Sequence, residues 1–351
     1  MSPKRELTRR QQLTQADLTL SETRPCRVWL VISSFRNDDD VIRILDQVQS
    51  VGRDVFERIL VVDSQGTGSV PSLLVDRGWD QIIYRSYPHN LGSGANLCER
   101  LRVAAEGGAD YAYALNHDGN FDPEVIRALL DAAKRMENLG IAYPLSYLIT
   151  ARRFNLTGIR ELPLPAMLVE SPPPDPLIDV FWSSSNGALY STAPAKRGIL
   201  PWPAMWMGWE DLEYGWRLSD YGYRQVIVRD AIYSDNYEYK QTWLAKTIDK
   251  PAWRTYYNFR NLLLAVRRSR NRPLFYAVVL YRILLELALI VLVRDLKLSR
   301  LRNMCRGVWD GFTERWVDNS ICEKSVEHFA HPPRLHTLSR SNSDTAELPD
   351  I

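Results

Sequence analysis

The chain has 351 residues, a length that suits one large domain or two modest ones. Its 45% apolar content supports a substantial core, and a net charge of +2 without any long basic run argues against a nucleic-acid-binding protein. Four scattered cysteines, Cys26, Cys98, Cys305 and Cys322, lack metal-ligand or redox spacing. We expect free thiols in a reducing, cytoplasmic compartment. Residues 1–24 are polar and lack a signal-peptide core, so a polar N-terminal arm is expected.

Apolar runs alternate with amphipathic segments over the first part of the chain. Strands are expected at 27–35, 59–64, 82–84, 111–115 and 141–145, with helices from 38, at 70–77, at 96–106 and at 123–138. Such alternation predicts an α/β fold with a mostly parallel, doubly wound sheet and right-handed crossovers. Asp38, Asp63, Asn90 and Asn116 each follow a strand, so we expect them at one rim of this sheet.

The alternation breaks between residues 150 and 179, where prolines exclude a continuing helix or a central strand. We expect an irregular insertion or a strand excursion there. A strand or tight turn at 180–190, an aromatic loop at 202–209, a helix at 210–221 with Gly222 as its cap and a strand at 224–228 follow. Residues 25–240 are therefore the expected catalytic domain.

Residues 241–324 are expected to form a helical C-terminal region, with a helix at 254–268, and the polar residues 325–351 a disordered tail. The apolar segment 274–293 is long enough to span a bilayer, but Arg282 and Glu286 interrupt it. Three alternatives stay open for this segment: a spanning helix, a helix buried against the domain, and a helix lying at an inner-membrane surface. Flanking arginines would suit anionic lipid.

Two polar features could carry chemistry. Asn116, His117 and Asp118 lie on a strand-to-helix loop, which is either a polar turn or a loop that holds a hard cation and a phosphate. Glu210 and Asp211 begin a helix, where carboxylates either stabilise the positive end of the dipole or act as a catalytic base. The aromatic residues Trp202, Trp206 and Trp209 are either core side chains or flat faces for sugar rings.

Six motifs in a fixed order resemble the large inverting glycosyltransferase family 2, which has the GT-A nucleotide-sugar fold. They are residues 28–35, the strand 59–64 ending in Asp63, the Asn-x-Gly-x-Gly-x-Asn loop 90–96, the Asn-x-Asp form of the DxD region at 115–118, the acidic motif 209–217 and the Tyr-Tyr-x-x-Arg-Asn stretch 256–261. Residues 307–312 show a weaker resemblance to the same family. The acidic motif is similar to that of rhamnosyl- and galactofuranosyl-transferase-like members.

The resemblance implies transfer of a sugar from a nucleotide-diphosphate donor to a glycan or lipid-linked hydroxyl, in cell-surface polysaccharide synthesis. It implies Asp211 as general base beside Glu210, and Mn or Mg held by Asp118, Asn116 and, in place of a family histidine, Asp235. The implied substrate-binding residues are Asp38, Asp63, Asn90, Gly92, Gly94, Asn116, Trp182, Ser185, Asn186, Gly187 and Trp209. Gly92 and Gly94 would let the backbone approach the nucleotide.

This sequence departs from the family pattern at two metal positions. Asn116 is a weaker cation ligand than aspartate, and Ser234 stands where the family often has a metal-binding histidine. These changes favour a weakly bound metal or, alternatively, a catalytically inactive nucleotide-sugar-binding or scaffolding homologue. A sugar nucleotidyltransferase and a Rossmann oxidoreductase are disfavoured, because the loop after the first strand, residues 33–37, has no glycine.

Overall fold

The computed structural model describes residues 26–64, 70–71, 74, 77, 79, 82–88, 90–149, 151–164, 166–235, 250–266 and 272–313. The predictions for the N-terminal arm, most of the 70–77 helix, the domain boundary near 240, Cys322 and the tail lie outside these residues. Cys26, Cys98 and Cys305 are free thiols.

Four parallel strands form one half of the central sheet, in the order β3 (Ile82–Tyr87), β2 (Arg58–Ser64), β1 (Val28–Phe35) and β4 (Tyr111–Asn116). The sheet then continues through β9 (Ala188–Ser191), β5 (Leu139–Leu148), β10 (Arg224–Asp235) and β8 (Leu177–Asp179). Strand β9 is antiparallel to both neighbours, whereas β5 and β10 are parallel. The predicted mostly parallel sheet is confirmed, and its reversed members are β9 and the edge strand β8, which is antiparallel to β10.

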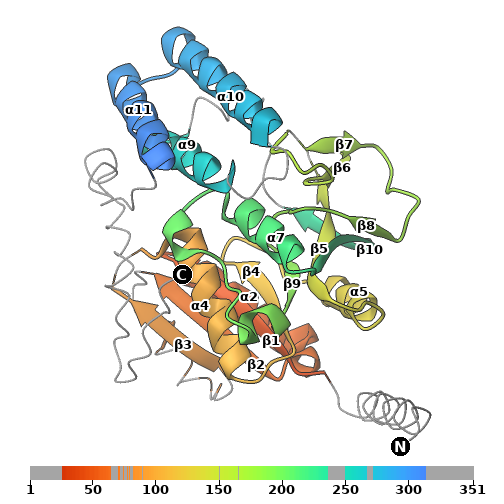
Figure 1. Ribbon diagram of the computed structural model, residues 1–351. Coiled ribbons are helices and arrows are strands. Elements are labelled where there is room, and N and C mark those ends of the chain that lie inside the picture. Colours follow the sequence, from red (N-terminus) through yellow and green to blue (C-terminus); the bar gives the residue numbers. More distant parts are fainter. Residues whose placement is uncertain are drawn as a thin grey trace, which may run out of the picture.

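Alternating side chains of the strands pack into two cores, one on each face of the sheet. Trp29 and Val31 of β1 face the core that includes helix α4 (Gly92–Glu106), and Leu30 and Ile32 face the one that includes α2 (Asp38–Val51) and α5 (Pro123–Ala133). Figure 1 shows these helices around the sheet. The predicted helix to residue 138 is five residues too long, because Asn138 turns left-handed (φ 53°) ahead of β5.

The segment from 150 to 179 is a strand excursion, which was one of the two predicted forms. Strands β6 (Arg153–Leu156) and β7 (Met167–Val169) extend antiparallel from β5, and β8 pairs with β10. The short helix α6 (Ala193–Lys196) and two 3-10 turns, η1 (Arg53–Val55) and η2 (Pro203–Met205), complete the connections.

Three helices follow the α/β part: α9 (Ala252–Val266), α10 (Arg272–Leu292) and α11 (Lys297–Thr313). In Figure 1 they lie together on the far side of α7 (Glu210–Asp220) from β3. Helix α11 lies within the segment 241–324 that was predicted to be helical, although its own bounds were not predicted. Its buried residues Asn303, Met304 and Gly307 pack it on α9, where the Asn303 amide donates to the Ala252 carbonyl.

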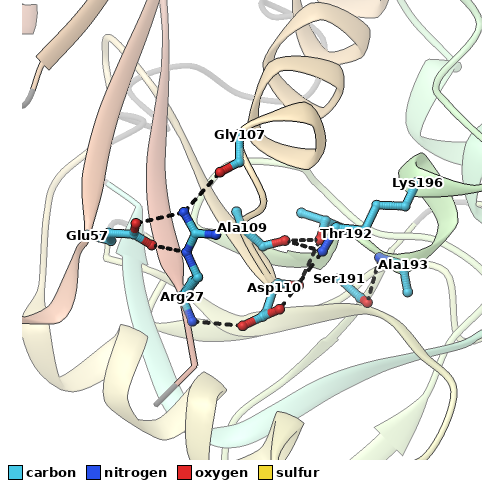
Figure 2. Close-up of polar contacts among 9 residues, drawn as sticks. All are labelled: Arg27, Glu57, Gly107, Ala109, Asp110, Ser191, Thr192, Ala193 and Lys196. Carbon is cyan, nitrogen blue, oxygen red and sulfur yellow. Dashed lines mark hydrogen bonds and ion pairs between the residues drawn. The ribbon is translucent and has the colours of Figure 1, made fainter. Parts of the chain in front are cut away.

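At the amino ends of the strands, polar contacts join several connections, as Figure 2 shows. Arg27 forms two bonds with the Glu57 carboxylate (2.6 and 2.8 Å), and its backbone N–H donates to Asp110 (2.9 Å). The Thr192 hydroxyl and the Lys196 ammonium both donate to the Ala109 carbonyl. These contacts fix the edge of the sheet opposite the strand ends that carry the predicted site.

Candidate active site

The carboxyl ends of β1, β2 and β4 bring the predicted rim residues together. Asp63 is fully buried and accepts a hydrogen bond from the Tyr84 hydroxyl. Burial raises the pKa of Asp63, and the nearby Asp38 charge raises it further, while Tyr84, Ser34 and His117 act in the opposite direction.

The 90–96 segment joins the same rim, where its glycines Gly92 and Gly94 pack against the aromatic loop. Asn90 accepts from the Gly92 N–H (2.9 Å), and Trp206 donates to the Asn90 carbonyl (3.2 Å). A side chain on Gly92 (φ 68°) would meet the Trp206 carbonyl at 2.3 Å. Gly94 likewise faces the backbone of Trp202 and Trp206. The described space around both glycines is filled by the aromatic loop, so they permit close packing of the start of α4 against that loop.

Asn116, at the end of β4, is tied to the 185–187 turn. Its backbone N–H donates to the Asn186 side chain (3.0 Å), and its own side-chain oxygen accepts from the Ser33 hydroxyl (3.0 Å). Gly187 (φ 76°) donates to the Ala114 carbonyl (2.8 Å). Two predicted substrate-binding residues, Asn186 and Gly187, therefore lie beside Asn116. Asp118, two residues on, is exposed.

A left-handed turn precedes α7 and positions the two carboxylates at the start of this helix. Gly208 (φ 84°) and Trp209 (φ 68°) are both left-handed, a conformation that an aromatic residue adopts only when its surroundings impose it. Glu210 then points to α4, where the Ser93 hydroxyl donates to its carboxylate. Asp211 faces Ser185 on the other side. Its Oδ1 is buried and has no hydrogen-bond partner among the described residues.

The surroundings of these carboxylates disfavour their ionisation. Burial, and then the neighbouring Glu210 charge, raise the pKa of Asp211 well above its ordinary value, against hydrogen bonding from Ser185 and the charge of Arg100. Burial also raises the pKa of Glu210, with Ser93 opposing it. Arg100 lies in the core beneath, donating to the Val31 and Leu115 carbonyls, and burial lowers its pKa to about 10. Asp211 is therefore a half-buried residue that follows a left-handed turn and has one buried oxygen without a described partner, which makes it a candidate base.

Two half-buried tryptophans, Trp182 and Trp209, pack against α7, the helix that carries Asp211. The rings of Trp182 and Trp209 pack edge to face at 6.2 Å, and the Arg282 guanidinium of α10 lies 4.8 Å from the Trp209 ring centre. Trp206 is instead a core residue, 3% exposed and packed on Trp253 and Tyr257. The aromatic loop was predicted to supply either core side chains or flat faces for sugar rings. Trp206 is a core side chain, and the second alternative remains a prediction for Trp209.

The sequence did not reveal how the aromatic loop is held. The Asn261 amide of α9 donates to three carbonyls of that loop, on Met205, Met207 and Gly208. Arg260 donates to the Ala204 carbonyl, and Trp209 donates to Asn258. These residues belong to the 256–261 motif. The sequence therefore identified the motif, but it did not show that these residues hold the aromatic loop. They fix the left-handed turn that presents Asp211.

We expect Asn261→Ala to destabilise the fold by roughly 2 kcal/mol, since the amide has two N–H donors and each buried hydrogen bond contributes about 1 kcal/mol. The loop would then lose its fixed turn, so catalytic turnover should fall while donor binding at the distant Asp63 side changes little. Denaturant unfolding and donor titration measure the two effects. Asn303→Ala, which removes one buried bond in α11, is the control and should leave turnover unchanged. Equal loss of turnover in both variants would contradict a positioning role for Asn261.

The metal predictions can be compared with the donor atoms present. Among the described residues, no group of three or more His, Cys, Asp or Glu side chains could hold a metal ion. Asp235 ends β10, but its side chain lies outside the described part of the chain. Asp118 offers an exposed carboxylate and Asn116 an amide oxygen, a set that fits a cation whose other ligands are phosphate and water oxygens.

No protein-family model and no curated protein matches this sequence. Solved structures do match. The mannosyltransferase PcManGT from Pyrobaculum calidifontis, in complex with GDP-Man and Mn²⁺, is 13% identical with a TM-score of 0.50, over 86% of this chain and 79% of that one. TarS 1–349 from S. aureus in complex with UDP is 11% identical with a TM-score of 0.52, over 82% of each chain.

The chain has a GT-A-like glycosyltransferase fold. Another TarS structure, in complex with UDP-GlcNAc, agrees with a TM-score of 0.51. At such low identity the likeness concerns the GT-A-like architecture, and it agrees with the α/β sheet and the C-terminal helices described above. The resemblance noted in the sequence motifs is confirmed at this level of fold.

Proposed function

We propose that the protein is an inverting glycosyltransferase that moves a sugar from a nucleotide-diphosphate donor to an acceptor hydroxyl. The observation that carries the proposal is Asp211, a half-buried residue with a raised pKa and one buried carboxyl oxygen that has no partner among the described residues, at the rim where the strand ends converge on a GT-A-like fold. The related structures were solved with GDP-Man and Mn²⁺ and with UDP-GlcNAc, which supports a nucleotide-sugar donor.

In this proposal Asp211 accepts the proton of the acceptor hydroxyl as the oxygen attacks the anomeric carbon opposite the leaving diphosphate. Attack from that side inverts the configuration. A carboxylate whose pKa is raised holds a proton more strongly than an exposed one, which makes it the better base. Glu210, held by Ser93, keeps α7 against α4 and raises the pKa of Asp211 through its charge.

The donor side consists of Asp63, Asp38 and the loop around Asn116. Asp63 would accept hydrogen bonds from the base or ribose, with its orientation fixed by Tyr84. Asp118 and Asn116 would bind Mn or Mg together with oxygens of the donor diphosphate. When bound, the cation would neutralise the negative charge that develops on the leaving group.

We further propose a cytoplasmic enzyme of cell-surface polysaccharide synthesis, with a glycan or lipid-linked acceptor. The order of the sequence motifs supports this role, and the free exposed thiols Cys26 and Cys305 suit a reducing compartment. The half-buried rings of Trp182 and Trp209 offer apolar faces for an acceptor sugar.

Incubation with a panel of nucleotide sugars, with Mn or Mg, tests the proposal. We expect nucleoside diphosphate release from one donor, accelerated by a sugar acceptor and producing a product of inverted anomeric configuration by NMR. A retained configuration would contradict Asp211 as the base of a single displacement.

A catalytically inactive nucleotide-sugar-binding protein is the second candidate. It is favoured by Asn116, whose side-chain oxygen already accepts from Ser33. This candidate predicts donor binding by calorimetry without nucleoside diphosphate release across the whole panel.

A further inference from the structure

The outward face of α10 is apolar along its whole length. Leu274, Ala277, Tyr281, Leu284, Ala288 and Val291 recur every three or four residues, and all are exposed. Large apolar side chains on this helix are 42–78% exposed: Leu274, Tyr276, Leu280, Tyr281, Leu284, Val291 and Leu292. Among the described residues, α10 is the one helix long and apolar enough to cross a membrane. A monomeric soluble protein rarely leaves so continuous an apolar stripe in water.

Helix α11 continues this surface. Leu298, Leu301, Cys305, Trp309 and Phe312 form an exposed stripe at helical spacing. The rings of Tyr276 on α10 and Phe312 on α11 stack at 6.2 Å, which joins the two stripes. Figure 1 shows the two helices as neighbours at the end of the molecule farthest from β3. We call the exposed residues of α10, α11 and the connection 293–296 the helical face.

The other side of α10 packs on α7 and the turn before it in its first half, and on α9 in its second half. Phe275 packs on Trp216 at 5.2 Å, Arg282 lies over Trp209, and Ile290 joins the cluster of Phe259. Glu286 forms a buried ion pair with Arg294 (2.9 Å). A helix packed on the protein along its length cannot also cross a bilayer, because crossing would remove the protein contacts of one half of the helix. The helical face can still lie flat in a membrane interface.

The charges around the helical face are mostly positive. Among residues 272–313 the exposed cations are Arg272, Lys297, Arg302 and Arg306, and the one exposed acid is Asp295. Arg302 and Arg306 lie one turn apart beside the α11 stripe. Tyr276, Tyr281 and Trp309 are residues that favour the membrane–water boundary. In a symmetric pair of chains these cations would meet each other, so a second copy fits the face poorly, whereas anionic headgroups match it.

We propose that the helical face docks on an anionic lipid bilayer, with α10 and α11 lying in the interfacial layer. Because Arg282 of α10 contacts Trp209, two residues before Asp211, docking brings the acceptor side of the site close to the lipid surface. The site would then reach a lipid-linked acceptor, a consequence that rests on the proposed function. Docking itself is independent of catalysis.

Co-sedimentation of the full chain with vesicles tests the proposal. We expect binding to vesicles of phosphatidylcholine with phosphatidylglycerol, weakened by salt, and much weaker binding to phosphatidylcholine alone. Leu284→Glu should lower binding at least about tenfold, since it puts a charge in the apolar stripe. Val51→Glu, at an exposed apolar site at the end of α2, is the matched control and should bind as the wild type does. Arg302→Gln with Arg306→Gln should lower binding only to the anionic vesicles.

Thermal melts verify folding of each variant, and nucleoside diphosphate release with a water-soluble acceptor should be equal in wild type and Leu284→Glu. This readout separates failure of docking from failure of the proposed transfer. Absence of wild-type binding would overturn the proposal, as would equal binding by Leu284→Glu. A wild-type dimer that Leu284→Glu dissociates, without vesicle binding, would assign the face to a second copy. Vesicle binding only after deletion of residues 314–351 would assign it to that segment.

Discussion

Asp211→Asn should abolish sugar transfer while sparing donor binding. Replacement of a general base typically lowers turnover by about 10²–10⁴-fold, and the amide cannot accept the acceptor's proton. Asp63, the proposed donor-binding residue, is bonded to Tyr84 and not to this side chain. Steady-state rates and nucleotide-sugar titration measure the two effects. Asp220→Asn, at the exposed end of the same helix, is the control. Retained turnover in Asp211→Asn would exclude Asp211 as the base.

The same variant should be at least as stable as the wild type at neutral pH. A carboxyl whose folded pKa is raised stabilises the fold only while protonated, and that contribution is lost as pH rises from the unfolded pKa through the folded one. Asparagine stays neutral at every pH, so the variant does not lose this stability as pH rises. A higher melting temperature together with lost turnover would separate a catalytic role from misfolding. In the wild type, transfer should rise with pH as Asp211 loses its proton.

Asp118→Ala should lower metal-stimulated transfer by about 100-fold or more, because a metal ion supplies several kcal/mol of charge stabilisation to the transition state. Asp118 is exposed on the loop after β4 and makes no described contact that its removal would break, so folding should be unaffected. Titration of the nucleoside diphosphate with and without Mn measures the effect directly: the metal should tighten binding to the wild type and not to the variant.

Asp131→Ala removes another exposed carboxylate, on α5, and provides the comparison. It should keep the metal effect on both binding and transfer. If Asp118→Ala still binds the nucleoside diphosphate more tightly with Mn, the cation is held by other residues. If metal has no effect on the wild type, the departures at Asn116 and Ser234 have removed metal dependence altogether.

The strands, the helices around them and the rim residues followed from local sequence patterns. Unbroken apolar runs mark β1, β2 and β4, since strands covered on both faces need apolar side chains at every position. Parallel strands bring their carboxyl ends to one edge, which is why Asp38, Asp63 and Asn116 meet as predicted. Asp122 caps α5 by accepting from the Glu124 N–H, a start that Pro123 also marked.

The reversed strand β9 and helix α11 could not be predicted in this way. Four residues of β9 carry too little periodicity to specify direction, and only their pairing with β4 and β5 decides it. Helix α11 mixes bases with apolar residues, and α9 supplies the surface on which its buried side packs. The sequence left three alternatives open for the apolar segment 274–293, and only the packing of α10 shows which of its sides is buried and which is exposed.

The sequence by itself determined the GT-A-like layout and the residues at its rim, since both depend on short-range patterns and on the order of motifs. Only the tertiary structure decided how Asp211 is presented. The turn before it is fixed by Asn261, more than fifty positions away, and by the close fit of Gly92 against Trp206. Such contacts leave no periodic trace along the chain, because they arise only when the folded backbone brings distant segments within hydrogen-bonding distance.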